Sequence, residues 1–175
     1  TGAQAAAYLL KANNITDVKI EKVAGNLTDH YDPSHKVLRL SEPVYGKASI
    51  AAVGVAAHET GHAIQHATKY GPLVLRSSLV PVANIGSAIG PTLAILGLVL
   101  SFGLLVDIGL LLFAGAVLFY VVTLPVEFNA SRRAIEILGR SGTMSQAELK
   151  GVKKVLSAAA MTYVASALSA IGNFV

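Results

Sequence analysis

Fifty consecutive residues, Ser77 to Val126, contain one charged side chain, Asp107. A helical membrane crossing needs about 20 predominantly apolar residues, so this run is long enough for two crossings and a tight turn. The alternative is a pair of helices buried in a soluble core, but so long a stretch without charge is not typical of soluble domains. The sequence therefore predicts a transmembrane helical hairpin.

The two spans are expected at Leu79 to Leu100 and Leu104 to Leu124, with the turn near residues 101–103 or at Asp107. A proline inside a helix removes a hydrogen bond and crowds the preceding turn, so a kink is expected at each proline of the first span. These prolines are Pro81 and Pro91. Small residues in the same span would let a neighbouring helix approach closely. They are Gly86, Ser87, Ala88 and Gly90.

Composition and charge agree with a membrane protein. Hydrophobic residues make up 53% of the 175 residues and charged residues only 14%. Basic residues flank the predicted hairpin at Lys69, Arg76, Arg132, Arg133 and Arg140, which predicts that both flanks are cytoplasmic. The net charge of +4 does not form a basic stripe with interleaved aromatic residues, so nucleic-acid binding is not expected. There is no cysteine, so any zinc site must use histidine and carboxylate.

A His-Glu-x-x-His pattern spans residues 58–62, in an apolar stretch without a strong turn signal before Gly71-Pro72. This context predicts a helix. Residues four apart lie about 6 Å apart along a helix and on one face, so one zinc ion can bind both His58 and His62. Glu59 lies about 100° around the helix, where it can take a proton from water on that ion. The alternative is a surface helix with two histidines and an acid, but three polar side chains in so apolar a helix would be costly to bury.

The residues before this helix predict a short helix followed by a small antiparallel sheet. The expected elements are a helix over Thr1 to Ala12 and strands over Asp17 to Val23, Leu27 to Tyr31 and Lys36 to Leu40. Apolar and polar residues alternate in the first strand, and Asp32-Pro33-Ser34-His35 is a turn sequence that joins the other two as a hairpin. An exposed strand edge could hold an extended peptide through main-chain hydrogen bonds. The sheet could equally serve only to cover the helix.

The other histidines are weaker candidates for ligands. His66 lies about 12 Å along the helix from His58, too far for both to bind one zinc ion. The HExxHxxGxxH spacing, which would bring a later histidine back, is absent from the sequence. His30 and His35 are candidate ligands or substrate contacts, although histidines in strands and loops are more often solvated.

Glu127 follows the predicted membrane hairpin and opens a helix expected to continue to Gly139. Because two crossings return the chain to the side it left, Glu127 can meet the helix of His58 and His62 again. It could supply a third protein ligand and leave the fourth zinc position to water. It could also be an acid favoured by the dipole at a helix N-terminus, with no metal involved. Glu136 is the rival ligand, but it lies deeper in a helix with two arginines.

The last region begins with a capping box, Ser145 to Glu148, which predicts the start of a helix. Residues 157–175 form nineteen positions without charge, and a third membrane helix is expected there. Tyr163 could stabilise an oxyanion, although a tyrosine packed between helices is the more usual case. The chain begins at Thr1 without a signal-peptide pattern, so a fragment or processed form is expected, and an upstream membrane segment stays possible.

Four motifs in the same order resemble the neutral zinc metallopeptidases of bacterial membranes known as the YugP type. They are LTDHYDPSHKVLRLSE, AAHETGHAIQHA, LVPVANIGS and LPVEFNASRRA, and the resemblance covers nearly the whole chain. More distantly, the chain is similar to the membrane gluzincins, which include heat-shock membrane proteases and CAAX prenyl proteases. The resemblance implies zinc as the cofactor, His58, His62 and Glu127 as its ligands, and Glu59 as the general base.

Two features depart from that pattern. Many gluzincins have an aspartate four residues after the third ligand, where it orients a ligand histidine, and here the position is Ser131. A serine can form a hydrogen bond there but brings no charge. The family also usually has an N-terminal membrane helix, which does not occur at the start of this sequence. Neither departure removes a zinc ligand.

The predicted fold is a mainly α membrane protein with a gluzincin-like core, in which a transmembrane hairpin separates HExxH from the third ligand. The predicted parts are a peptidase core over 1–76, the hairpin over 77–126, core helices over 127–156 and a further membrane helix over 157–175. The predicted protein is a multi-pass zinc metallopeptidase of the cell membrane. Its active site would be cytoplasmic and its substrate a peptide or membrane protein.

Two other functions are compatible with these residues. A zinc-stabilised membrane scaffold or adaptor would bind other membrane proteins without cleaving them. An intramembrane protease of the site-2 type would need an aspartate motif later in the membrane, and Asp107 is the candidate. Its neighbours, Leu-Val-Asp-Ile-Gly, lack the Asn-Pro-Asp-Gly character of that motif, so this function is ranked third. The sequence specifies neither a cleavage preference nor an oligomeric state.

Overall fold

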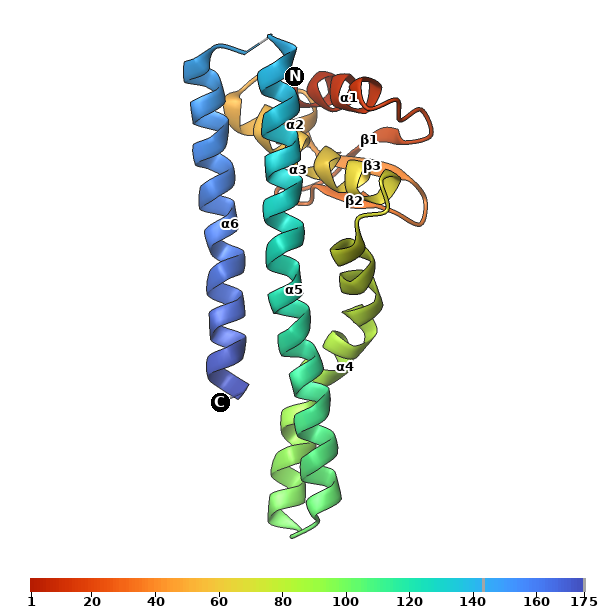
Figure 1. Ribbon diagram of the computed structural model, residues 1–175, viewed down its shortest axis with the longest axis vertical. Helices are drawn as coiled ribbons and strands as arrows, with labels where there is room; N and C mark the ends of the chain where they lie inside the picture. Colours follow the sequence, from red (N-terminus) through yellow and green to blue (C-terminus); the bar gives the residue numbers. More distant parts are fainter. Residues whose placement is uncertain (143, 175) are drawn as a thin grey trace. The chain divides into compact units, whose positions relative to one another are not determined.

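The computed structural model describes residues 1–142 and 144–174, drawn in Figure 1. The described residues form two compact units. The first unit comprises Thr1–Tyr70 and Glu127–Ala160, and the second comprises Gly71–Val126 with the residues that follow Ala160. Two long helices, α5 (Gly103–Ser141) and α6 (Gln146–Phe174), contribute residues to both units.

The first unit begins with helix α1 (Gly2–Ala12), close to its predicted bounds. Thr1 caps the helix, because its hydroxyl accepts a hydrogen bond from the backbone N–H of Gln4 at 3.2 Å. A second short helix, α2 (Glu42–Tyr45), was not predicted from the sequence. It is a single turn with proline near its start, too short for a periodic apolar pattern.

The sheet of the described chain has three strands in the order β1 (Lys19–Val23), β3 (Val37–Ser41), β2 (His30–Asp32). Strands β2 and β3 form the predicted antiparallel pair, but β1 and β3 run parallel. The prediction of an antiparallel sheet was therefore wrong, and the sheet is mixed. The chain reverses twice between β1 and β3, so these strands run in the same direction. They pair because β3, with Leu38 and Leu40 fully buried, occupies the centre of the sheet.

Helix α3 (Ile50–Ala67) carries the His-Glu-x-x-His pattern, which confirms the predicted helix. Its small residues allow close packing on two sides. Ala56 packs in a cluster with Leu40 of the sheet, and Ala57 packs in another with Leu138 of α5. The strands lie beside α3 in Figure 1. Helix α3 is therefore a central, largely buried element of the first unit.

In the second unit, α4 (Gly71–Val99) packs against the first part of α5, and the two helices join at residues 100–102, near the predicted turn. The predicted close approach at small residues is confirmed. A Cβ atom at Gly86 would overlap the backbone of Leu112, and one at Gly90 would lie 2.9 Å from the carbonyl oxygen of Gly109. Glycine is needed at both positions because neighbouring backbone occupies the space of a side chain.

Helix α5 continues without interruption through Pro125 to Ser141. The prediction that a new helix begins at Glu127 was therefore wrong. Pro125 removes only one backbone hydrogen bond, and no turn residues follow it, so the helix continues on both sides. Because Glu127 lies inside a helix, the dipole at a helix N-terminus does not explain its presence.

Helix α6 begins where the capping box predicted. The N–H of Glu148 donates to the Ser145 hydroxyl at 3.1 Å, and the N–H of Ser145 donates to the Glu148 carboxylate at 3.2 Å. Within residues 1–142 and 144–174, three helices are long and apolar enough to cross a membrane, namely α4, α5 and α6. The third apolar helix, expected over residues 157–175, corresponds to the part of α6 that ends at Phe174, and residue 175 lies outside the described residues.

Candidate metal centre

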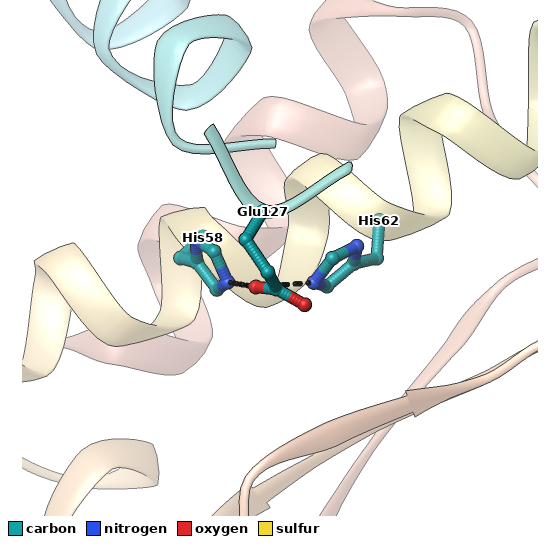
Figure 2. A group of neighbouring side chains, drawn as sticks. All are labelled: His58, His62 and Glu127. Carbon is teal, nitrogen blue, oxygen red and sulfur yellow. Dashed lines mark hydrogen bonds and ion pairs between the residues drawn. The ribbon is translucent and has the colours of Figure 1, made fainter. Parts of the chain in front are cut away.

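Three side chains of the first unit converge where α3 lies beside α5 (Figure 2). Oε2 of Glu127 lies 2.7 Å from Nε2 of His58 and 3.3 Å from Nε2 of His62. The two imidazole rings have centroids 4.9 Å apart and are nearly perpendicular. Figure 2 shows the carboxylate of Glu127 between the two rings. Glu127 thus forms one group with two histidines that precede it by 65 and 69 positions.

The donor set fits a zinc ion. One potential ligand atom from each residue lies within 4.8 Å of the others. Two ligand atoms of a tetrahedral zinc ion are about 3.4 Å apart, given bonds of about 2.1 Å. The nitrogen–oxygen distance to His62, 3.3 Å, is close to that value, and the distance to His58, 2.7 Å, is shorter. Two imidazoles and a carboxylate are also a known ligand set of catalytic zinc, which leaves one position for water.

The group is largely shielded from solvent. Glu127 is only 3% exposed, and His62 is 9% exposed. A buried carboxylate is costly unless its charge is compensated by close partners. The two imidazoles, or a metal ion between the three side chains, provide this compensation.

Each histidine is oriented by a partner at its second ring nitrogen. Nδ1 of His58 lies 2.7 Å from the hydroxyl of Ser131, the position where many gluzincins have aspartate. Nδ1 of His62 lies 2.9 Å from Oε1 of Gln65, which is fully buried. Because both Nδ1 atoms are engaged in this way, both Nε2 atoms face Glu127 and are available to a metal.

A chain of hydrogen bonds holds the amide of Gln65 in this orientation. Nε2 of Gln65 donates to Oδ1 of Asn129 at 3.0 Å, and Nε of Arg133 donates to the same oxygen at 2.7 Å. Since both donors point to Oδ1, the Gln65 amide presents its own oxygen to His62. That oxygen can only accept, so His62 carries its proton on Nδ1. Three side chains therefore favour, for neutral His62, the tautomer whose Nε2 can bind a metal.

The absence of a side chain at Gly61 brings the two helices together. A Cβ atom at Gly61 would lie 2.9 Å from the carbonyl carbon of Ala130 and closer still to its oxygen. Ala130 follows Glu127 by three residues and is fully buried. Glycine between the two histidines thus allows α5 to approach α3 closely enough for Glu127 to reach them.

A known family matches this chain along its whole length. The family model described as "Putative neutral zinc metallopeptidase" matches residues 1–175. The chain belongs to this family of zinc metallopeptidases. A similar protein of Bacillus subtilis (strain 168), named "Putative membrane protease YugP", is 52% identical over 168 residues, which is 96% of this chain and 75% of that protein. No solved structure matches the chain.

Membership agrees with two observations made above. Zinc is the metal of the family, and His58, His62 and Glu127 are a group in this metallopeptidase that could hold it. A membrane protease needs membrane-spanning or membrane-bound segments, and α4, α5 and α6 are long and apolar enough to cross a bilayer.

The other candidate residues of the metallopeptidase lie elsewhere or have different contacts. Glu59 is half-buried in α3, next to His58. His30 and His35 are exposed, and His35 pairs with Asp32 at 2.8 Å. Tyr163 is 38% exposed. It belongs to the second unit, as does Asp107, whereas the metal group lies in the first.

His66 contacts the sheet and is not part of the group formed by His58, His62 and Glu127. Its Nδ1 lies 2.8 Å from the hydroxyl of Tyr31, so β2 is joined to α3 one turn beyond His62. Burial, followed by the nearby charges of Asp17 and Asp32, raises the pKa of Tyr31 to about 12. Tyr31 is therefore neutral near pH 7 and keeps its hydroxyl proton.

Sequence reasoning missed two residues that support the metal group of this metallopeptidase, Gln65 and Asn129. A signal existed for Gln65, because it follows His62 by three positions and thus lies on the same helix face. Asn129 had no comparable signal. Its contact with Gln65 depends on the packing of α3 against α5, which no local pattern reveals.

Proposed function

We propose that this protein is a membrane-bound metalloendopeptidase with His58, His62 and Glu127 as zinc ligands and Glu59 as the general base. The observation that carries the proposal is the convergence of a buried carboxylate of α5 on two imidazoles of α3, at 2.7 and 3.3 Å. Zinc supplies Lewis-acid activation of water and of the peptide carbonyl when it is bound. The membership of the chain in a zinc peptidase family supports this assignment.

Glu59 is proposed to move the proton of the reaction. Its carboxylate takes a proton from the attacking water while the water oxygen bonds to the peptide carbonyl carbon. It then delivers that proton to the nitrogen of the leaving amine as the carbon–nitrogen bond breaks. The half-buried position of Glu59 beside His58 on α3 supports this role. Ser131 and Gln65 hold the imidazoles in place during these steps.

The edge strand β2 is proposed to bind the substrate. It has β3 on one side only, so its other edge can pair with an extended peptide. Its Tyr31 contacts His66 at the end of α3, which keeps this edge near the metal helix. An extended segment of a peptide or membrane protein is the proposed substrate class.

The proposed topology follows the predicted division of the chain. Residues 1–76 and 127–156 form the peptidase core, 77–126 a transmembrane hairpin, and 157–175 a further span. The basic residues that flank the hairpin support a multi-pass arrangement with the active site on the cytoplasmic side. The number of candidate helices, three within the described residues, is compatible with it.

The test compares Glu59→Gln and Glu127→Gln in the purified, detergent-solubilised chain. Zinc content is measured by elemental analysis, and hydrolysis by cleavage of a quenched fluorescent peptide and of an unfolded protein. Glu59→Gln should keep zinc but lose at least about 99% of activity, because general-base catalysis contributes about 10²- to 10⁴-fold. Glu127→Gln should lose both zinc and activity.

Glu42→Gln is the control, since it removes the same charge at an exposed position of α2. It should keep both zinc and activity. Unchanged hydrolysis in Glu59→Gln would exclude Glu59 as the base. A wild-type protein that binds zinc stoichiometrically but cleaves neither substrate would favour the scaffold function instead.

A further inference from the structure

A pocket of about 360 Å³ lies in the first unit, between α5 and α6. This volume lies within the range of small-molecule sites, about 300–1,000 Å³. The side chains that give the pocket its chemical character are Phe128, Arg132 and Glu136 of α5 and Lys153, Ser157 and Ala160 of α6. The peptidase mechanism described above uses none of these six residues.

The pocket carries charges without protein partners. Arg132, Lys153 and Glu136 are exposed, and their side chains form no hydrogen bond or ion pair with another residue in the described part of the chain. Two cations and one anion leave the pocket with a net positive charge. Arginine and lysine are the side chains that bind phosphate groups best. An anionic group is therefore the best occupant of this pocket.

One end of the pocket is apolar, and the positions of its residues along α5 and α6 show which end this is. Along α5, Phe128 precedes Arg132 by one turn and lies nearer in sequence to the apolar run that ends at Val126. Along α6, Ala160 follows Lys153 by two turns and leads into uncharged residues. On both helices the apolar end of the pocket thus adjoins the proposed membrane span, and the basic end lies farther from it.

We propose that this pocket binds the headgroup of an anionic phospholipid. Arg132 and Lys153 bind the phosphodiester, and Glu136 accepts hydrogen bonds from headgroup hydroxyls such as those of phosphatidylglycerol. The upper part of an acyl chain lies along Phe128 and Ala160. Basic pockets between membrane helices on the cytoplasmic side are a known mode of lipid-headgroup binding.

Charges outside the pocket favour the anionic lipid over a zwitterionic one. Lys150, Lys154 and Arg140 belong to the same helices and are exposed. They attract an anionic membrane surface without lining the pocket. The apolar end favours a lipid over inorganic phosphate, because phosphate has no apolar group that could contact Phe128 and Ala160.

The proposed lipid site adjoins the metal centre. Ser131 also lines the pocket, and its hydroxyl lies 2.7 Å from Nδ1 of His58. The inference rests on the proposed placement of α5 and α6 in a membrane, but not on hydrolysis. Lipid binding can be measured on metal-free protein, so failure of the peptidase proposal would not affect this result.

The experiment measures lipids bound to the full chain by native mass spectrometry in detergent. Phosphatidylglycerol, phosphatidylethanolamine and inorganic phosphate are added separately. The wild-type protein should retain one phosphatidylglycerol at concentrations where the other two do not bind. The double variant Arg132→Gln/Lys153→Gln should bind that lipid at least about tenfold more weakly, because it loses two charge-assisted hydrogen bonds.

The matched control is Arg140→Gln/Lys154→Gln, which removes two positive charges from the same helices outside the pocket. Its affinity should stay within about threefold of wild type. Ser157→Trp fills the pocket without changing charge and should also abolish binding of the lipid. Circular dichroism and thermal unfolding verify that each variant folds. Equal losses in both double variants, or no preference of the wild type for phosphatidylglycerol over the two other probes, would overturn the proposal.

Discussion

Gly61→Ala should weaken zinc binding, although alanine is intrinsically the better residue in a helix by about 1 kcal/mol. The added Cβ atom would lie 2.9 Å from the carbonyl carbon of Ala130 and 3.0 Å from its Cα atom. Carbon atoms in ordinary contact are about 3.5–4.0 Å apart. The backbones of α3 and α5 would therefore have to separate by about 0.5–1 Å at this point.

This separation exceeds what a zinc site tolerates. Metal–ligand distances in a competent site agree with their ideal values within about 0.2 Å. Glu127 lies three residues before Ala130 on α5 and moves with it, whereas His58 and His62 stay on α3. Zinc affinity should fall about 10- to 100-fold, the range measured when the support of a metal ligand is lost. Overpacking costs about 1–3 kcal/mol, which offsets or exceeds the gain in helix propensity.

Gly54→Ala is the matched control in the same helix. Its Cβ atom would lie 3.5 Å from Cγ1 of Val152, an ordinary contact. This variant should gain up to about 1 kcal/mol in the free energy of unfolding and keep its zinc affinity. Zinc affinity is measured by competition with a chromophoric chelator, and stability by denaturant unfolding in detergent. If Gly61→Ala behaves like Gly54→Ala in both assays, the close approach of the helices does not control the site.

Three further predictions concern the residues around the metal group. Ser131→Ala should lower zinc affinity about tenfold, because it removes the partner of His58 Nδ1, and Ser131→Asp should restore the affinity. Zinc affinity is measured by chelator competition. Equal affinities of the wild type and the two variants would contradict this prediction. Gln65→Met should lower zinc affinity about 10- to 100-fold, and the variant should unfold at a lower denaturant concentration, because His62 and Asn129 lose a buried partner. If the ¹⁵N chemical shift of His62 Nδ1 is the same in the variant and the wild type, Gln65 does not select the tautomer of His62. The pKa of Tyr31 is about 12 in the folded protein, whereas a tyrosine in the unfolded chain has the ordinary value of 10.0. As the pH rises from 10 to 12, the unfolded chain therefore loses the hydroxyl proton of Tyr31 first, and the free energy of unfolding should fall. Tyr31→Phe should remove that part of the alkaline loss of stability, measured as the difference between the two unfolding profiles.

Much of the secondary structure could be predicted because its signals are local. The apolar stretch around His58 predicted α3, the capping box at Ser145 predicted the start of α6, and alternation predicted β1. The errors came where a local signal was absent or misleading. A new helix was predicted to begin at Glu127, but α5 continues through that position. The one-turn helix α2 was too short for any pattern.

The pairing of strands was wrong for a different reason. The sequence predicted an antiparallel sheet and the hairpin of β2 and β3, but it named no partner for β1. In the structure β1 pairs with β3, because the most apolar strand takes the central position. Strand order depends on which surfaces are buried against α3, and that information is not contained in any one strand.

The sequence by itself determined which residues can bind zinc and which segments can cross a membrane. Both properties depend on spacing and hydropathy within a few helical turns, so His58, His62 and the apolar run before Glu127 could be found directly. Only the tertiary structure placed Glu127 beside the two histidines, and only it showed the contacts of Gln65 with Asn129 and of Gly61 with Ala130. These depend on the distance and rotation between two helices, which are set by the packing of α3 against α5 and cannot be calculated from either helix alone.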